Sequence, residues 1–307
     1  VWGGLVDVPA DCAVLPDGLI AVLSGAVAED QVALRESGVF GRRLVRADRT
    51  AGPAAKKFVP SGAVLVTGGT GLIGGCTARL FAERGAQRVV LVSRSGPGAA
   101  GVAGLAASVA ALGTAVEVVS CDVSEREPVG ALLDWAGGVS AVVHSAGVDH
   151  GAPLMELTAQ GLAEASSVKV AGAVNLHELT VERGLELDAF VVFSSGAAVW
   201  GSGLLGGYAA ANAGLEALVA RRRGAGLVGS SVAWGLWGGG GMGAGDGGDW
   251  VAGFGVRPMS PERGIEGLAV VLDEGQDRLV VADVDWERFV ATYTLHRPSP
   301  LLSSLPE

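Results

Sequence analysis

A glycine-rich run that could bind phosphate lies between an apolar, strand-like segment and a helical pattern. Its glycines at 68, 71 and 74 follow one another at intervals of three residues. Glycine permits a tight turn and a close approach of the backbone to phosphate oxygens, and the N–H groups of the next helix then face the anion. A plain turn is the alternative in a glycine-rich chain, but the strand–turn–helix context favours nucleotide binding. The expected cofactor contacts in this run are Thr67, Gly68, Gly69, Thr70, Gly71, Leu72, Ile73 and Gly74.

The ends of later apolar segments supply further candidate contacts to a nucleotide. Arg94 stands where NAD-binding proteins usually have a carboxylate for the ribose 2′-hydroxyl, and its cation suits a 2′-phosphate instead, which favours NADPH. Asp122 could reach the adenine, and Gly147 leaves room for ribose and nicotinamide. A surface arginine is the alternative for Arg94. The expected contacts outside the glycine run are Ser93, Arg94, Asp122, Val123, Ser145, Ala146, Gly147, Lys169 and Tyr208.

Tyr208 has the sequence context expected of a proton donor. The chain has two tyrosines, and Tyr293 lies near its C-terminal end. Tyr208 follows a strand-like segment that ends at Ser195 and opens an alanine-rich helical pattern. Hydride reduction of a ketone needs a proton for the developing alkoxide, which tyrosine can give if a nearby cation stabilises its phenolate. A hydroxyl or amide donor should also polarise the carbonyl.

These residues require a scaffold that brings segments far apart in sequence to one place. From residue 61 onward, short β-branched runs alternate with longer alanine-rich stretches. The alternation predicts βαβ units and an α/β fold with a doubly wound parallel sheet of the Rossmann type. A glycine-rich segment at 238–248 and a proline-rich tail at 298–306 interrupt it. The expected strands are 63–66, 88–93, 116–119, 140–144, 190–194, 227–233 and 278–282.

The first 60 residues follow a different pattern, and we expect two domains, 1–60 and 61–307. Residues 19–23 could form a helix, and residues 31–35 and 38–46 look like two paired strands joined by a turn at residues 36–38. Polar residues and two prolines between 47 and 60 indicate a linker.

Composition excludes several classes of function. The net charge of -10 argues against a nucleic-acid-binding protein, which usually has a basic stripe. The run 221–223, three arginines, could meet an acidic carrier protein, although a solvated helix end is the alternative. Three cysteines without a CxxC pair suggest neither a disulfide framework nor a zinc site, which fits a reducing, cytoplasmic location. No apolar run is long enough to span a membrane.

Motifs along residues 61–300 resemble the ketoreductase domain of modular type I polyketide synthases, within the short-chain dehydrogenase/reductase superfamily. Residues 1–46, beginning VWGGLVDVP, resemble the end of that family's structural subdomain, as if the chain were excised from a longer polypeptide. The matching motifs are TGGTGLIGG (67–75), VSR (92–94), CDV (121–123), HSAG (144–147), KVAGA (169–173), FSSGAAVWG (193–201), YAAAN (208–212) and WGLW (234–237).

The resemblance implies a role for each catalytic position. Tyr208 would donate the proton, and Ser195 would hold the carbonyl oxygen. Most short-chain dehydrogenases have lysine four residues after the tyrosine, where this chain has Asn212. In the ketoreductases the lysine and asparagine positions are exchanged, so Lys169 would take the part of the lysine. The implied cofactor is NADPH. The implied partners are an acyl carrier protein, which presents a β-ketoacyl thioester on its phosphopantetheine arm, and the other domains of a synthase module.

The resemblance also implies a stereochemical type. The Leu-Asp-Asp motif of B-type ketoreductases is missing after HSAGV, whereas the A-type tryptophan stands eight residues before Tyr208, as Trp200. This combination predicts an L-configured β-hydroxyl, with ordinary packing as the alternative for Trp200. Leu205 occupies the place where epimerising A-type members have histidine, which indicates the A1 subtype. We expect Met242 to contact substrate from a lid in the glycine-rich stretch.

Three other functions compete with this interpretation. A redox-inactive ketoreductase-like domain could act as an epimerase or a scaffold, and turnover of a β-keto thioester with NADPH distinguishes it. A free-standing short-chain dehydrogenase would lack the VWGGLVDVP piece. A regulatory nucleotide-binding protein would not need the set of serine, tyrosine, lysine and asparagine.

Overall fold

The structure, a computed structural model, separates into two compact units. Residues 52–283 form the larger one, and residues 1–51 with 284–307 form the smaller one. The boundary that the sequence places near residue 60 stays a prediction. The residues that the structure describes are 4–9, 18–47, 56–147, 151–240, 246–295 and 297–306.

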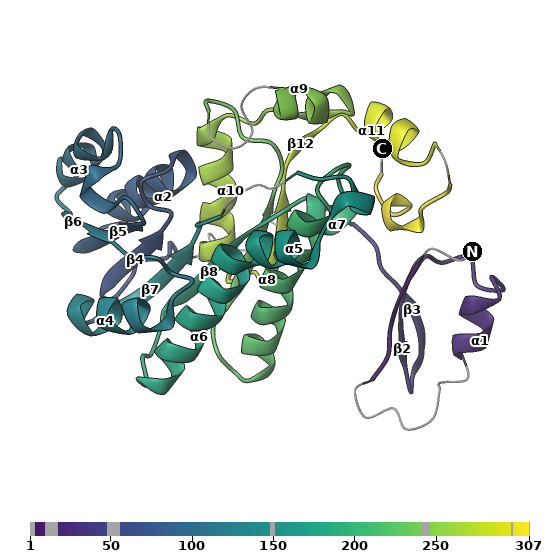
Figure 1. The fold of residues 1–307 in the computed structure, drawn as a ribbon, viewed down its shortest axis with the longest axis horizontal. Coiled ribbons are helices and arrows are strands. Elements are labelled where there is room, and N and C mark those ends of the chain that lie inside the picture. The colour runs from purple at the N-terminus through teal and green to yellow at the C-terminus, as the bar shows by residue number, and fades with distance from the viewer. Residues whose placement is uncertain are drawn as a thin grey trace. The chain divides into compact units, whose positions relative to one another are not determined.

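A seven-stranded sheet forms the centre of the larger unit, in the order β11-β9-β8-β7-β4-β5-β6 (Figure 1). Every neighbouring pair in this sheet is parallel, which confirms the predicted doubly wound α/β fold. Each of the seven segments expected from the sequence forms one strand. The strands are β4 (Ala63–Thr67), β5 (Arg88–Ser93), β6 (Ala115–Ser120), β7 (Val139–His144), β8 (Ala189–Ser195), β9 (Ser230–Trp234) and β11 (Arg278–Val281).

Helices cover both faces of this sheet, because its central strands are apolar on both sides. All residues of β4 and β7 are buried, as expected for parallel strands between two helical layers. The helices on one face are α2 (Leu72–Glu83), α3 (Val102–Ala110) and α10 (Pro261–Glu274). Those on the other face are α4 (Arg126–Ala136), α6 (Gly172–Glu182) and α8 (Gly206–Gly224).

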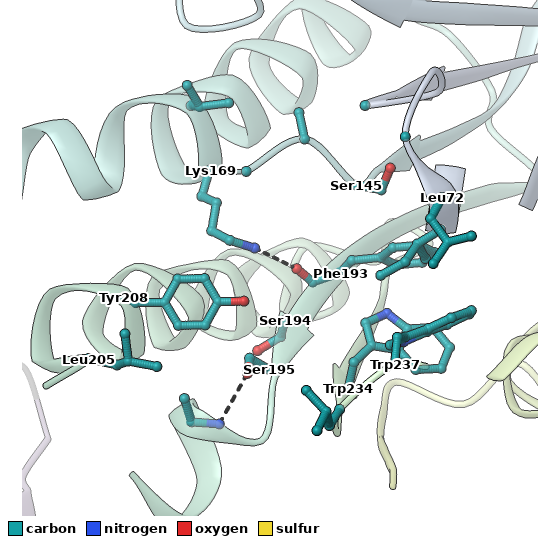
Figure 2. A pocket seen from close by; sticks show the side chains of 18 of the residues that line it. Leu72, Ser145, Lys169, Phe193, Ser194, Ser195, Leu205, Tyr208, Trp234 and Trp237 are labelled. Carbon is teal, nitrogen blue, oxygen red and sulfur yellow. Dashed lines mark hydrogen bonds between the residues drawn. The ribbon is translucent and has the colours of Figure 1, made fainter. Parts of the chain in front are cut away.

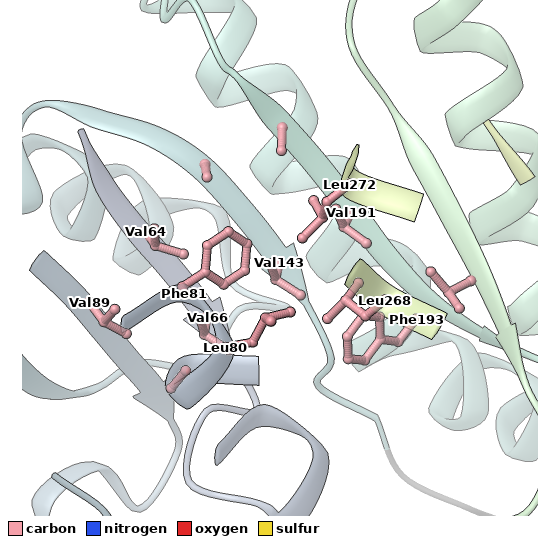
Figure 3. Close-up of a cluster of buried hydrophobic side chains, with 14 of the residues drawn as sticks. Val64, Val66, Leu80, Phe81, Val89, Val143, Val191, Phe193, Leu268 and Leu272 are labelled. Atoms are coloured by element: carbon pink, nitrogen blue, oxygen red, sulfur yellow. The ribbon is translucent and has the colours of Figure 1, made fainter. Parts of the chain in front are cut away.

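The first of these layers contains a continuous apolar cluster. Figure 3 shows Phe81 and Leu80 of α2 and Leu268 and Leu272 of α10 against the sheet. Their partners are valines and a phenylalanine from four neighbouring strands: Val64, Val66, Val89, Val143, Val191 and Phe193. This packing fixes the strand ends from which the loops of the site emerge.

The strand order reverses at β4, which pairs with β5 on one side and β7 on the other. In parallel α/β sheets, ligands bind in the crevice outside the carboxyl ends of the strands at such a switch point. The glycine-rich run after β4 and the HSAG segment after β7 therefore flank the expected crevice.

The structure also contains several shorter helices and strands. The glycine-rich stretch 238–248, which interrupts the predicted alternation, contains the start of a helix at Asp246, and its residues 241–245 lie outside the described part of the chain. The shorter elements are α5 (Ala159–Ser166), the π-helical turn η3 (Ser167–Ala171), α7 (Ala197–Trp200), α9 (Asp246–Gly253), β10 (Val256–Arg257) and β12 (Asp283–Val284).

The smaller unit contains a three-stranded sheet, α1 (Gly18–Leu23) and α11 (Trp286–Tyr293). The predicted pairing of β2 (Gln31–Arg35) with β3 (Gly38–Gly41) is confirmed as antiparallel. β3 ends at Gly41, earlier than the predicted residue 46, because β2 begins at Gln31 and offers no further partners. A strand that the sequence did not indicate, β1 (Leu5–Asp7), pairs parallel with β2. Among the described helices, none combines the length and apolar character needed to cross a membrane.

A partly buried ion pair joins the end of α2 to α10, and the chain before β4 bonds to the same carboxylate. Arg84 is buried and bonds both carboxylate oxygens of Asp273, which also accepts a hydrogen bond from the Phe58 N–H at 2.7 Å. Burial would raise the pKa of Asp273, but the hydrogen bonds from Arg84 and Phe58 outweigh it and lower this pKa.

Replacing Asp273 by asparagine should therefore destabilise the larger unit. The change leaves the buried Arg84 cation without its counter-charge, which costs roughly 3 kcal/mol for a fully buried pair and about 2 kcal/mol here, since Asp273 is partly exposed. Urea unfolding measures the loss. The control is Arg126→Ala, which breaks exposed pairs with Glu178 and Glu182 and should cost under about 1 kcal/mol. Equal losses in both variants would contradict the prediction.

Candidate active site

The glycine-rich turn packs so closely that it has no room for a side chain at Gly68 or Gly74. Gly68 has φ +67°, and a Cβ there would lie 2.8 Å from the Ala146 nitrogen. A Cβ on Gly74 would lie 2.3 Å from the Gly68 carbonyl oxygen. Helix α2 starts after Gly71 with no side-chain cap and no acidic residue in its first turn. Its first N–H groups and the helix dipole therefore favour an anion at this end.

A cavity of about 840 Å³ lies at the carboxyl ends of the central strands. It extends from the glycine turn to the start of α8, and Figure 2 shows part of its lining. A cavity of this size is in the range of cofactor sites. Of the residues predicted for cofactor, substrate or catalysis, it is lined by Gly68, Thr70, Gly71, Leu72, Ile73, Gly74, Ser93, Arg94, Asp122, Val123, Ser145, Ala146, Gly147, Lys169, Ser195, Trp200, Leu205 and Tyr208.

Three predicted site residues are buried rather than on the cavity wall, and one lies outside the described residues. Thr67 and Gly69 are buried at the base of the turn, and Asn212 is fully buried in α8. Met242 belongs to the stretch that the structure does not describe. The roles given to all these residues stay predictions.

Lys169 is a nearly completely buried lysine, with 3% of its surface exposed. It lies in η3, a π-helical turn between α5 and α6, a kind of turn that often occurs at functional sites. Its Nζ donates a hydrogen bond to the Phe193 carbonyl oxygen at 3.1 Å and lies 5.3 Å from the centre of the Tyr208 ring (Figure 2). A cation at this distance is attracted by the ring and would stabilise a phenolate.

Tyr208 lies in the first turn of α8, and Ser195 ends β8 on the same side of the cavity. The Ser195 Oγ accepts a hydrogen bond from the Ala197 N–H at 3.2 Å. The Asn212 side-chain amide donates to the Tyr208 carbonyl oxygen at 2.8 Å, while its Oδ1 has no hydrogen-bond partner among the described residues. The geometry brings a cation, a phenol and a hydroxyl together, as carbonyl reduction requires.

The opposite end of the cavity carries charges of both signs. Asp122 accepts hydrogen bonds from the hydroxyl and the N–H of Ser124, and these bonds, with the charge of Arg94, lower the pKa of Asp122 against the opposing effect of burial. The carboxylate is therefore ionised at neutral pH. Arg94 is exposed at the end of β5 and faces the same space.

Aromatic residues at the end of β9 and beyond it also line the cavity, and they were not among the predicted site residues. Trp234 and Trp237 pack edge to face with ring centres 5.0 Å apart, and Trp234 packs on Phe193 at 5.3 Å. Trp250 of α9 lines the cavity as well. The motif WGLW contained a signal for the first two, because tryptophans at a strand end lie where parallel sheets bind ligands.

The fold and this site define a nucleotide-binding protein of the short-chain dehydrogenase/reductase type, and comparisons with known proteins agree. The KR domain family matches residues 62–239. The whole chain aligns, at 46% identity, with a part of the pikromycin polyketide synthase component PikAIII of Streptomyces venezuelae that makes up 20% of that protein. Likewise, 99% of the chain aligns, at 46% identity, with a part of the erythronolide synthase EryA3 of Saccharopolyspora erythraea that makes up 10% of that protein.

Solved structures give the same result. One described as A-type ketoreductases from a modular polyketide synthase matches 99% of this chain and 65% of its own chain, with 45% identity and a TM-score of 0.94. An A1-type ketoreductase matches the same shares with a TM-score of 0.93. The chain belongs to the ketoreductase domain family of modular type I polyketide synthases, whose members reduce β-keto groups. It spans a fifth or less of these two curated relatives.

His144, the last residue of β7, is buried close to this site without lining the cavity. Burial, with a further contribution from the Lys169 charge, lowers the pKa of His144 from 6.5 to about 4. In the unfolded chain the imidazole binds a proton at an ordinary pKa near 6.5. The stability that the neutral ring provides is therefore present above about pH 6.5 and is lost as the pH falls toward 4.

Acid should consequently destabilise the wild-type domain more than a His144→Gln variant. Between pH 7 and pH 4.5 the wild type should lose about 2 kcal/mol of unfolding free energy that the variant does not lose, because glutamine takes up no proton. Urea unfolding at the two pH values measures the difference. Parallel losses in both proteins would show that His144 titrates normally in the folded state.

Proposed function

We propose that this domain uses NADPH to reduce the β-keto group of a carrier-bound polyketide intermediate to an L-configured β-hydroxyl. The observation that carries the proposal is the position of the buried Lys169 ammonium, 5.3 Å from the Tyr208 ring centre in a cavity shared with Ser195 and the glycine turn. A surface lysine or a structural tyrosine would not need this arrangement, because burying an ammonium is costly.

The cavity fits a dinucleotide along its length. The close contacts of Gly68 and Gly74 and the uncapped start of α2 suit a pyrophosphate. Arg94 suits a 2′-phosphate, and Asp122 and Val123 flank the space for adenine. Gly147 leaves room for the nicotinamide ribose beside Lys169. When bound, the cofactor supplies the hydride.

The side chains near Tyr208 handle the oxygen and its proton. The Ser195 hydroxyl donates a hydrogen bond to the carbonyl oxygen of the substrate and orients it. As the hydride reaches the β-carbon, the Tyr208 hydroxyl gives its proton to that oxygen, so that the C=O bond becomes C–O–H. The Lys169 ammonium stabilises the phenolate left on Tyr208. Asn212 holds the first turns of α8 in place through its bond to the Tyr208 carbonyl.

The substrate is a β-ketoacyl thioester on the phosphopantetheine arm of an acyl carrier protein. The proposal rests on the multidomain polyketide synthases among the relatives, whose other domains would be the partners of this one. Trp200 and Leu205 line the cavity near Tyr208, where they could select one face of the ketone. The 45% identity to an A1-type ketoreductase supports this stereochemistry.

The reaction is tested with NADPH and a racemic 2-methyl-3-oxopentanoyl thioester, with chiral chromatography of the alcohol. We expect an L-hydroxy product, and Tyr208→Phe should lower kcat at least ~100-fold because the general acid is removed. The variant should still bind NADPH, as measured by nucleotide fluorescence. A D-hydroxy product would refute the A-type assignment. Absence of product from folded, NADPH-binding protein would refute the reductase and leave a scaffold or an epimerase.

The cofactor preference is tested at Arg94. Arg94→Ala should raise the KM for NADPH about tenfold or more, since a charge-assisted bond to phosphate contributes roughly 1.5–3 kcal/mol. The KM for NADH should change little, which makes NADH the matched control in the same protein. An equal effect on both cofactors would mean that Arg94 does not recognise the 2′-phosphate.

A further inference from the structure

His144 connects two parts of the site through one imidazole ring. Its Nδ1 lies 2.7 Å from the Oγ1 of Thr67, the last residue of β4 before the glycine turn. Its Nε2 lies 2.9 Å from the carbonyl oxygen of Lys169 in η3. All three residues are buried, with at most 3% of their surface exposed. The ring therefore links the end of the nucleotide-binding strand to the turn that carries the buried lysine.

The two hydrogen bonds define the tautomer of the ring. The carbonyl oxygen of Lys169 can only accept, so Nε2 carries the hydrogen and donates it. Nδ1 is then an acceptor, and the Thr67 hydroxyl donates to it. The pKa of about 4 agrees with a neutral ring in this state. A protonated ring would leave the Thr67 hydroxyl without its acceptor and would place a second positive charge near Lys169.

Close contacts hold the ring and the lysine stem where they are. A Cβ on Gly172, the first residue of α6, would lie 3.0 Å from the His144 Cε1 and 2.8 Å from the Val123 Cγ2. A Cβ on Gly147 would lie 2.8 Å from the Lys169 Cε. Both backbone segments thus approach so closely that neither the imidazole nor the lysine stem can move toward them.

We propose that His144 is a positioning residue, which fixes the height of Lys169 relative to Tyr208 by holding the carbonyl oxygen of the π-helical turn and anchoring it to Thr67. This inference rests on the proposed function, since it assigns to Lys169 the task of stabilising the Tyr208 phenolate. In this arrangement the His144 side chain, which touches neither substrate nor cofactor, holds the glycine turn and the Lys169 ammonium in a fixed position relative to each other.

A purely structural histidine would affect stability but not the pH dependence of catalysis. Of the described titratable groups, Lys169 faces Tyr208 from η3, and Glu216 lies further along α8 on the Ser194 hydroxyl. Arg94 and Asp122 line the other end of the cavity, and His144 itself lies behind Lys169. If Lys169 is displaced, its ammonium lies farther from the Tyr208 hydroxyl and stabilises the phenolate less.

The test compares four variants of this chain: His144→Leu, His144→Gln, Thr67→Val and Ser140→Ala. Leucine removes the donor to the Lys169 carbonyl, whereas glutamine keeps an N–H near the place of Nε2. Valine at 67 removes only the hydroxyl that fixes the ring. Ser140 is the control, because it lies on the same strand and accepts a partly buried hydrogen bond from the Gly62 N–H at 2.7 Å, at the end remote from the site.

We expect His144→Leu to lower kcat about tenfold or more, with the KM for NADPH within about threefold of the wild type. The alkaline limb of its kcat profile should move to higher pH, because the displaced cation stabilises the Tyr208 phenolate less. His144→Gln should restore most of kcat and the wild-type profile, and Thr67→Val should show a smaller shift in the same direction. Ser140→Ala should leave the profile unchanged.

Hydrogen exchange of the backbone amides of residues 166–172, measured without cofactor, gives a readout independent of turnover. Exchange should accelerate in His144→Leu and Thr67→Val but not in Ser140→Ala. Unchanged exchange and an unchanged pH profile in a folded His144→Leu protein would overturn the proposal. If that variant does not fold, the same two results for Thr67→Val decide. A wild type without turnover rejects the proposed function, while the exchange data still judge the role of His144.

Discussion

The site depends on keeping one lysine ammonium in the interior of the larger unit. Removing an ammonium from water costs several kcal/mol unless other groups compensate it. The Lys169 ammonium donates a hydrogen bond to the Phe193 carbonyl oxygen and lies over the Tyr208 ring, and both groups come from elements next to the cavity. The π-helical turn, the close approach of Gly147 and the end of β8 are therefore features that this single charge requires.

The same constraint explains why the sheet order matters to the chemistry. β4 lies between β5 and β7, so that the glycine turn, Arg94 and the loop after β7 open onto one crevice. β8 lies next to β7 and ends at Ser195, which brings the hydroxyl to the same edge. The end of the cavity with Arg94 and the end with Ser195 and Tyr208 therefore belong to one continuous space. The backbone of the central strands, buried on both faces, keeps these ends at fixed distances.

Much of this arrangement could be predicted from the sequence, because the spacing of apolar residues and the positions of glycines between segments determine it. The seven strands followed from β-branched runs, and the glycine turn followed from its place between strand and helix. Tyr208, Ser195 and Lys169 were selected by their motifs and do share one cavity. The stereochemical type and the preference for NADPH stay predictions, since side-chain identity alone does not define how a ligand is oriented.

Other features depend on tertiary contacts that no local pattern encodes. The π-helical turn at Lys169 is one such feature, because nothing in the sequence Ser167–Ala171 distinguishes it from an ordinary helical turn. Asn212 is buried rather than on the cavity wall. β1, with three residues, forms only because β2 offers an edge. The helix that starts at Asp246 runs against the low helix propensity of glycine, which packing can override.

The most direct test of the account is a double-mutant cycle of kcat with Lys169→Met, Tyr208→Phe and the double variant. If the two side chains act as one unit, the double variant will lose about as much as the more damaging single change, and fully additive losses would contradict the account.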